Sequence, residues 1–199
     1  FIGIETVNRK NLEAVGKEFN DARRYQERIA AIRRQGIGIV AGMIVGMDND
    51  DKRVFERTLT FLQRARIDAL QLNILTPLPG TPLYEEMEGR GRVVDRDWSH
   101  YDFRHVVIEP ALMSAKDLQD GADWLYRQFY RLDRVLLRFA RSVFAIGWVP
   151  ALLSLRLNLT YRYDLRRANV HGRNPAAAMK RTAMWTGWTR FTRLAEAHR

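Results

Sequence analysis

Three apolar runs, each of β-strand length, alternate with two segments of helical periodicity in the first 75 residues. The runs are FIGIE (residues 1–5), IGIVAGMIV (37–45) and ALQLNIL (69–75). Nearly continuous apolar runs are typical of strands buried on both faces. Helix-length connections between such strands favour parallel pairing with right-handed crossovers. The chain is therefore expected to begin as an α/β protein with a parallel sheet.

The two connecting segments carry signals for helices. Apolar residues recur at helical spacing from Tyr25 to Gln35, and Gly36 stands where a helix-ending glycine belongs. The second helix is expected to extend to Arg66, with the acidic stretch 48–51 supplying its N-terminal cap.

The remainder of the chain is predicted to be mainly helical. Thr81 caps a short helix, and Ser114 forms a capping box with Asp117. Behind that box, apolar residues step by four and three from Leu118 to Phe139, which predicts one long amphipathic helix. The run HVVIEP (residues 105–110) is a candidate fourth strand, either antiparallel or at an edge of the sheet.

Composition excludes several kinds of site. The chain has no cysteine, so it supplies no disulfide, zinc–thiolate site, iron–sulfur ligand or catalytic thiol. No two of its histidines have helical i, i+4 spacing, so structural roles are expected for them rather than a metal site. They are His100, His105, His171 and His198. No residue is assigned a catalytic role.

The net charge of +10 is concentrated near the C-terminus. Residues 151–199 hold 10 Lys and Arg and 2 Asp and Glu, a balance of +8, which leaves +2 for residues 1–150. Such a basic segment favours nucleic acid, an anionic membrane or an acidic protein as partner. The preceding stretch, residues 142–155, has 14 uncharged residues, Trp148 among them. It is either a buried helical hairpin or an interfacial anchor.

Small and polar residues mark the ends of the three runs. Gly42, Ile44 and Gly46 alternate onto one face of the second run. The missing side chains of the two glycines either admit a flat ligand at the carboxyl end of a strand, with Ile44 as its apolar support, or allow close packing by a helix. Glu5 could bind ligand hydroxyls or an ammonium group, or serve as a cap or ion-pair partner. Asn73 could bind a base edge or satisfy a neighbouring loop.

Several of these motifs together resemble the second half of a radical S-adenosylmethionine (SAM) enzyme. They are FIGIE, GIVAGMIVGMDND (residues 38–50) and NILTPLPGTPLYEEM (73–87). The likeness is greatest to the cobalamin-binding radical SAM proteins. Within these it points to the branch that contains hopanoid methylases, whose C-terminal domain carries a pattern similar to DWSHYDFRHVVIEPALMS (97–114). The resemblance extends from Phe1 to about Leu132.

The resemblance implies a fold and a cofactor site. Residues 1–90 would form the last three strands of a partial parallel (β/α) barrel, and residues 91–199 a mainly α-helical, basic C-terminal domain. In the family's Gly-x-Ile-x-Gly-x-x-Glu pattern, the acidic position falls on Asn49 here, with Asp48 one residue early. The residues implied to bind SAM are Glu5, Gly42, Ile44, Gly46, Asn73, Leu75 and Thr76.

The resemblance also implies a function for a parent protein. This would be a cobalamin-dependent methyltransferase acting on a lipid or another hydrophobic substrate. The ligands of its 4Fe-4S cluster and of cobalamin would lie in a missing N-terminal half, so the present chain alone is expected to be inactive. The expected partners are SAM, that N-terminal half and an anionic membrane reached through residues 142–199, but not nucleic acid.

The expected location is the cytoplasm, with peripheral attachment to a membrane. The rival interpretation is a non-enzymatic α/β adaptor whose basic aromatic tail binds a membrane or nucleic acid.

Overall fold

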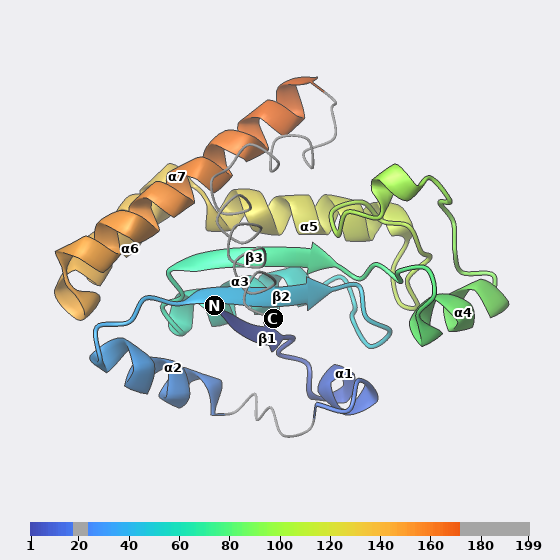
Figure 1. Cartoon of the computed structure of the whole chain (residues 1–199), viewed down its shortest axis with the longest axis horizontal. Coiled ribbons are helices and arrows are strands. Elements are labelled where there is room, and N and C mark those ends of the chain that lie inside the picture. The colour runs from blue at the N-terminus through green and yellow to red at the C-terminus, as the bar shows by residue number, and fades with distance from the viewer. Residues whose placement is uncertain (18–23, 172–199) are drawn as a thin grey trace, which may run out of the picture. The chain divides into compact units, whose positions relative to one another are not determined.

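The computed structural model describes residues 1–17 and 24–171, with side chains up to Asp164. Three strands form one parallel sheet in the order β1 (Ile2–Glu5), β2 (Val40–Val45) and β3 (Ala69–Ile74). Their arrowheads point the same way in Figure 1, so all three carboxyl ends lie at one end of the sheet. The predicted α/β architecture with a parallel sheet is confirmed.

The connections between the strands are helical, as predicted. Helices α1 (Arg9–Ala14) and α2 (Tyr25–Arg34) join β1 to β2, and α3 (Val54–Arg64) joins β2 to β3. Gly36 follows α2 with φ of 76°, which confirms the expected left-handed glycine beyond a helix end.

The cap predicted for the second helix is confirmed only in part, because Asp51 Oδ1 accepts a hydrogen bond from Arg53 N (3.0 Å) in the turn that precedes α3. Arg53 occupies the N-cap position of α3 and makes no side-chain capping bond. The other two acids of this stretch have other partners, because Asp48 is ion-paired with Arg92 and Asp50 is buried beside the end of β2. Only one of the three acids therefore contributes to the start of the helix.

The second half of the chain contains short and long helices. After β3 come α4 (Pro82–Gly89), the 3-10 helix η1 (Trp98–His100), α5 (Ala115–Phe129), α6 (Leu132–Ile146) and α7 (Trp148–His171). The Thr81 cap and the Ser114–Asp117 capping box are both present. The candidate strand 105–110 is not part of the sheet, because it contributes only an isolated antiparallel bridge between Val93 and Ile108.

The single long helix predicted from Leu118 to Phe139 is also wrong. Residues 130 and 131 separate α5 from α6, and Arg131 has extended backbone angles of φ −58° and ψ 139°. The side chain of Tyr130 is buried and bonded to β3, which fixes the position at which α5 stops. Beyond the break, Leu132 and Leu136 are exposed instead of continuing the apolar stripe into the core.

Tyr126 of α5 and Tyr130, which directly follows this helix, close the free edge of β3. The Tyr126 hydroxyl accepts a hydrogen bond from Leu72 N (2.9 Å) and donates one to Leu72 O (3.0 Å). The Tyr130 hydroxyl does the same with Leu70, at 3.0 Å to N and 2.6 Å to O. An edge strand normally presents these groups to a further strand. The sheet therefore ends at β3 on this side.

The two faces of the sheet differ in cover. One face carries the core residues Ala41, Met43, Val45, Leu70, Leu72 and Ile74, which are almost fully buried. The opposite face, named here the open face, carries Gly42 and Ile44 of β2 beside Gln71 and Asn73 of β3. The last three of these are only partly buried. A ligand can therefore reach the sheet from the open face.

The chain divides into two compact units, residues 1–159 and 160–199. The boundary expected near residue 90 stays a prediction. Residues 172–199, which contain His198 and most of the basic tail, lie outside the described residues. Within the described ranges, no helix combines the length and the apolarity that crossing a membrane requires.

Candidate functional site

Strand register brings three of the seven expected site residues, Gly42, Ile44 and Asn73, onto the open face. Gly42 pairs with Gln71, and Ile44 pairs with Asn73. Gly42 also lies opposite Gly3 of β1, so two glycines stand side by side. A Cβ added to Gly42 would lie 2.7 Å from the ring of Phe1. Gly3 and Gly42, named here the glycine strip, thus let a flat aromatic ring lie against the backbone. A larger residue at position 42 would displace this ring.

Glu5 joins this face through an unusual backbone conformation. It has φ of 66°, in the region that non-glycine residues seldom adopt, and the β1–β2 register shifts at this point. Its Oε1 would lie 2.8 Å from a Cβ on Gly3, so the carboxylate folds back over β1. The same oxygen is 2.8 Å from Lys17 Nζ. The ion pair that the sequence left open as an alternative is therefore present. In the described part of the chain, Oε2 of Glu5 accepts no hydrogen bond.

Asn73 carries an unused hydrogen-bonding group at the same face. Its amide makes no hydrogen bond with any described residue, although it is partly buried between Ile44 and the end of β3. Gln71, two residues earlier on the same face, is likewise without a partner in the described part of the chain. Partly buried amides normally find partners. The pair therefore offers donors and acceptors to a ligand, and Gln71 was not among the expected site residues.

Gly46 belongs to a different environment from Gly42 and Ile44. It follows β2 with φ of 94°, which turns it away from the alternation of the strand. A Cβ on Gly46 would lie 2.6 Å from Leu118 Cδ2 of α5. Close packing by a helix, the alternative left open for the glycine pair, accounts for Gly46. Its contact with SAM stays a prediction.

Replacing Gly46 with alanine is expected to lower the free energy of unfolding by about 2 to 4 kcal/mol. The left-handed backbone and the overpacking against Leu118 both contribute to this loss. Urea unfolding would measure it, with Gly89→Ala as the control, because a Cβ at Gly89 meets no atom within 4 Å. Equal midpoints for Gly46→Ala and the parent chain would contradict the packing described here.

Leu75 and Thr76 lie at the carboxyl end of β3, as expected, but point to local roles. Leu75 N donates to Val45 O (2.9 Å), and the Leu75 side chain packs on the cluster of Met87, Val107 and Ile108. The buried Thr76 hydroxyl donates to Ile74 O (3.0 Å). Both residues therefore shape the end of the strand. A contact with SAM stays a prediction for each.

A buried carboxylate that the sequence did not single out holds the turn after β2. Asp50 Oδ2 accepts from the backbone N–H groups of Gly46 (3.1 Å) and Met47 (3.2 Å), and Oδ1 accepts from Asn11 Nδ2 (2.7 Å). Asn11 Oδ1 in turn accepts from Asn49 N (3.1 Å). The network ties α1 to the end of β2. Burial raises the pKa of Asp50 to about 6 against these hydrogen bonds.

The raised pKa of Asp50 predicts that the free energy of unfolding depends on pH. The folded pKa of about 6 lies above the ordinary value of 3.8, so the folded state holds the proton more tightly than the unfolded state. The stabilising contribution is complete below pH 3.8 and is lost as the pH rises to about 6. A difference of about 2 pKa units corresponds to roughly 3 kcal/mol.

The measurement is the free energy of unfolding of the parent chain and Asp50→Asn between pH 4 and 7. The parent is expected to lose stability relative to Asp50→Asn as the pH rises, since the variant has no proton to release. Parallel curves for the two proteins would show that Asp50 does not titrate in this range.

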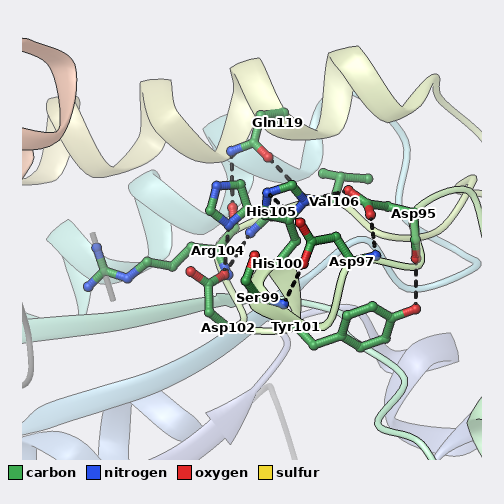
Figure 2. A network of polar contacts seen from close by, with 10 residues as sticks. All are labelled: Asp95, Asp97, Ser99, His100, Tyr101, Asp102, Arg104, His105, Val106 and Gln119. Carbon is green, nitrogen blue, oxygen red and sulfur yellow. Dashed lines mark hydrogen bonds and ion pairs between the residues drawn. The ribbon is translucent and has the colours of Figure 1, made fainter. Parts of the chain in front are cut away.

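A loop beyond the carboxyl end of β3 is held by two histidine–aspartate pairs (Figure 2). His100 Nδ1 lies 2.6 Å from Asp95 Oδ2, and His105 Nδ1 lies 3.0 Å from Asp102 Oδ1. The two imidazole rings stack with centroids 4.7 Å apart. The hydrogen bond to Asp95 raises the pKa of His100. Both histidines therefore have the structural surroundings expected for them.

The same loop is joined to its neighbours on two sides. Gln119 of α5 accepts from Val106 N (3.1 Å) and donates to Arg104 O (3.1 Å), as Figure 2 shows. On the other side, Ile74 N donates to Phe103 O (2.8 Å), which ties the loop to the last residue of β3. In the described ranges, no cluster of three or more His, Asp or Glu side chains could hold a metal ion.

The chain is similar to several curated enzymes, although no protein-family model matches it. It is 31% identical over 148 residues to bacteriochlorophyllide d C-12(1)-methyltransferase of Chlorobaculum tepidum, covering 74% of this chain and 32% of the relative. It is 35% identical over 105 residues to hopanoid C-2 methylase of Rhodopseudomonas palustris, covering 52% of this chain and 20% of the relative.

A third relative extends the match along the chain. Anaerobic magnesium-protoporphyrin IX monomethyl ester cyclase of Cereibacter sphaeroides is 29% identical over 177 residues, covering 86% of this chain and 28% of the relative. The chain thus spans about a third of the length of these relatives or less. All three are named as enzymes, which does not favour the adaptor interpretation. The resemblance noted in the sequence is confirmed, and the chain belongs to the family of cobalamin-dependent radical SAM methyltransferases and their relatives.

Proposed function

We propose that this chain supplies the SAM-binding half of a partial (β/α) barrel in a radical SAM methyltransferase. The observation that carries the proposal is the open face, where the unpartnered Asn73 amide lies beside a flat glycine strip. The opposite face is filled by core side chains, and β3 is closed at its free edge by Tyr126 and Tyr130. In the described residues no strand pairs with the outer edge of β1, so earlier strands of a barrel have a place to pair.

Each residue of the open face has a role in this proposal. Gly42 lets the adenine ring approach the backbone in the place now taken by the ring of Phe1, which is 76% exposed and would move aside, and Ile44 gives the adenine an apolar surface. The Asn73 amide donates to and accepts from the base edge. Both of its polar atoms are available, because neither forms a hydrogen bond with a described residue. Glu5 accepts from ribose hydroxyls or the ammonium group, with Lys17 fixing its carboxylate.

The remaining chemistry is proposed to come from outside these 199 residues. The chain has no cysteine, so it does not fit as the holder of a 4Fe-4S cluster. With that cluster and cobalamin held elsewhere in the parent protein, SAM would supply radical chemistry and methyl transfer. The names of the relatives include a hopanoid methylase and bacteriochlorophyllide methyltransferases. A lipid or another large hydrophobic molecule is therefore the proposed substrate.

Calorimetry with SAM tests the proposal in the cluster-loaded parent protein. Asn73→Leu should weaken SAM binding about tenfold, as expected for the loss of about 1.4 kcal/mol of hydrogen bonding. Gln26→Leu on the exposed surface of α2 is the matched control and should leave binding unchanged. Unchanged affinity in Asn73→Leu would reject the open face as the SAM site.

A further inference from the structure

A cavity of about 350 Å³ lies near the amino end of the sheet, away from the site described above. It is lined by the C-terminal end of α3 and by one side of α6. Its charged lining consists of Arg33, Arg66, Arg134, Arg138, Arg141 and Asp68. Asp68 forms a buried ion pair with Arg33, so the five arginines and one aspartate leave a formal charge of +4 around this arginine cavity.

Only some of these arginines form hydrogen bonds or ion pairs within the described part of the structure. Arg134 donates to Gln128 O (2.8 Å) and Arg138 donates to Phe129 O (2.8 Å), so both satisfy carbonyls near the end of α5. The side chains of Arg66 and Arg141 make no hydrogen bond or ion pair with any described residue.

The surroundings of Arg138 disfavour the positive charge of its guanidinium group. Its Nε is buried without an acceptor, and burial lowers its pKa to about 10. The side chain also stacks on Phe129, with the guanidinium carbon 3.9 Å from the ring centroid. Three groups are therefore available to bind an anion: the Arg138 Nε and the side chains of Arg66 and Arg141.

An exposed apolar surface continues from the cavity along α6. Phe144, three residues after Arg141 and thus on a neighbouring part of the same helix face, is 92% exposed. Gly147, with φ of 91°, turns the chain from α6 into α7, where Trp148 is 67% and Leu153 is 64% exposed. These three residues form the α6–α7 tip. Of the two alternatives for residues 142–155, their exposure favours the interfacial anchor.

We propose that the arginine cavity and the α6–α7 tip together dock the protein on a membrane rich in anionic phospholipid. A headgroup phosphate enters the cavity, where guanidinium groups bind phosphate oxygens with matched geometry. Phe144 and Trp148 enter the boundary between headgroups and acyl chains. Charge complementarity selects this partner, because a second copy of the chain would bring the same excess of positive charge to the contact.

Cosedimentation with vesicles tests the proposal on the whole chain. Binding to phosphatidylglycerol vesicles is expected, with little binding to phosphatidylcholine vesicles. Arg66→Gln/Arg141→Gln should weaken binding about twenty-five-fold, since each basic residue near an anionic surface contributes about a factor of five. Lys10→Gln/Arg53→Gln removes the same charge from exposed positions near the other end of the sheet and should change binding less than twofold. Trp148→Ser should weaken binding without altering the circular dichroism spectrum.

Three results would overturn the proposal. Equal losses of vesicle binding in Arg66→Gln/Arg141→Gln and in Lys10→Gln/Arg53→Gln would mean that only the overall charge matters. A rise in melting temperature with inorganic phosphate, abolished by Arg66→Gln/Arg141→Gln, without vesicle binding would assign the cavity to a soluble anion. Self-association in solution that Phe144→Ser abolishes, again without vesicle binding, would assign the tip to a second copy of the chain.

Discussion

Replacing Asp68 with alanine is expected to lower the free energy of unfolding by about 3 to 5 kcal/mol, because it leaves Arg33 buried and unpaired. The Asp68 carboxylate binds Arg33, accepts from Ile39 N (2.8 Å) and accepts from the Ser142 hydroxyl (2.7 Å). It thus joins α2, the start of β2 and α6. A loss of this size is a large fraction of the stability of a typical domain.

Urea unfolding at neutral pH measures this effect. Asp68→Asn should fall between the parent chain and Asp68→Ala, because the amide oxygen keeps an acceptor for Ile39 N but not the charge that balances Arg33. The control is Asp133→Ala, which removes an exposed partner of Arg131 and should leave the midpoint unchanged. A midpoint for Asp68→Ala equal to that of the control would show that the buried pair adds nothing to stability.

Removing both edge-closing hydroxyls is expected to cost about 3 to 5 kcal/mol. In Tyr126→Phe/Tyr130→Phe the aromatic rings stay, but the N–H and C=O groups of Leu70 and Leu72 lose their partners. Buried backbone groups left unpaired each cost roughly 1 to 3 kcal/mol. Water molecules that enter beside the strand will replace some of the lost hydrogen bonds and reduce this cost. The freed edge of β3 also becomes a template for pairing with another chain.

Amide hydrogen exchange tests this prediction residue by residue. Leu70 and Leu72 should lose protection in the double variant, while Met43 in the centre of the sheet should exchange only through global unfolding. Tyr84→Phe is the control, because its hydroxyl makes no hydrogen bond that ties it to the sheet. Full protection of Leu70 and Leu72 in the double variant would contradict the described edge.

The strands were predictable because their signal is local. Apolar runs of five to nine residues, separated by amphipathic segments, are enough to indicate a buried parallel sheet. Alternation with period two also placed Gly42 and Ile44 on one face, and placed Gln71 with Asn73 on one face of β3. Which of these faces remains open depends on register and on the packing of distant helices, and the sequence does not encode these locally.

The failures share one cause, which is that a distant contact overrides a local pattern. The apolar stepping of three and four continues through Phe129, Leu132 and Leu136, so periodicity gives no sign of the break that Tyr130 imposes by bonding to Leu70. Likewise Asp48, Asp50 and Asp51 look alike in sequence. The approach of Asn11 from α1 distinguishes the buried Asp50 from its partly buried neighbours.

Photoaffinity labelling tests the central claim most directly, because it locates the adenine ring. The cluster-loaded parent protein would be irradiated with an azidoadenine analogue of SAM, digested with trypsin and analysed by mass spectrometry. The label is expected on the peptides 35–52 or 67–90, which carry Gly42, Ile44 and Asn73, and excess SAM should suppress it. Labelling confined to peptides of α5, α6 or α7, and equally suppressed by SAM, would contradict a SAM site on the open face of the sheet.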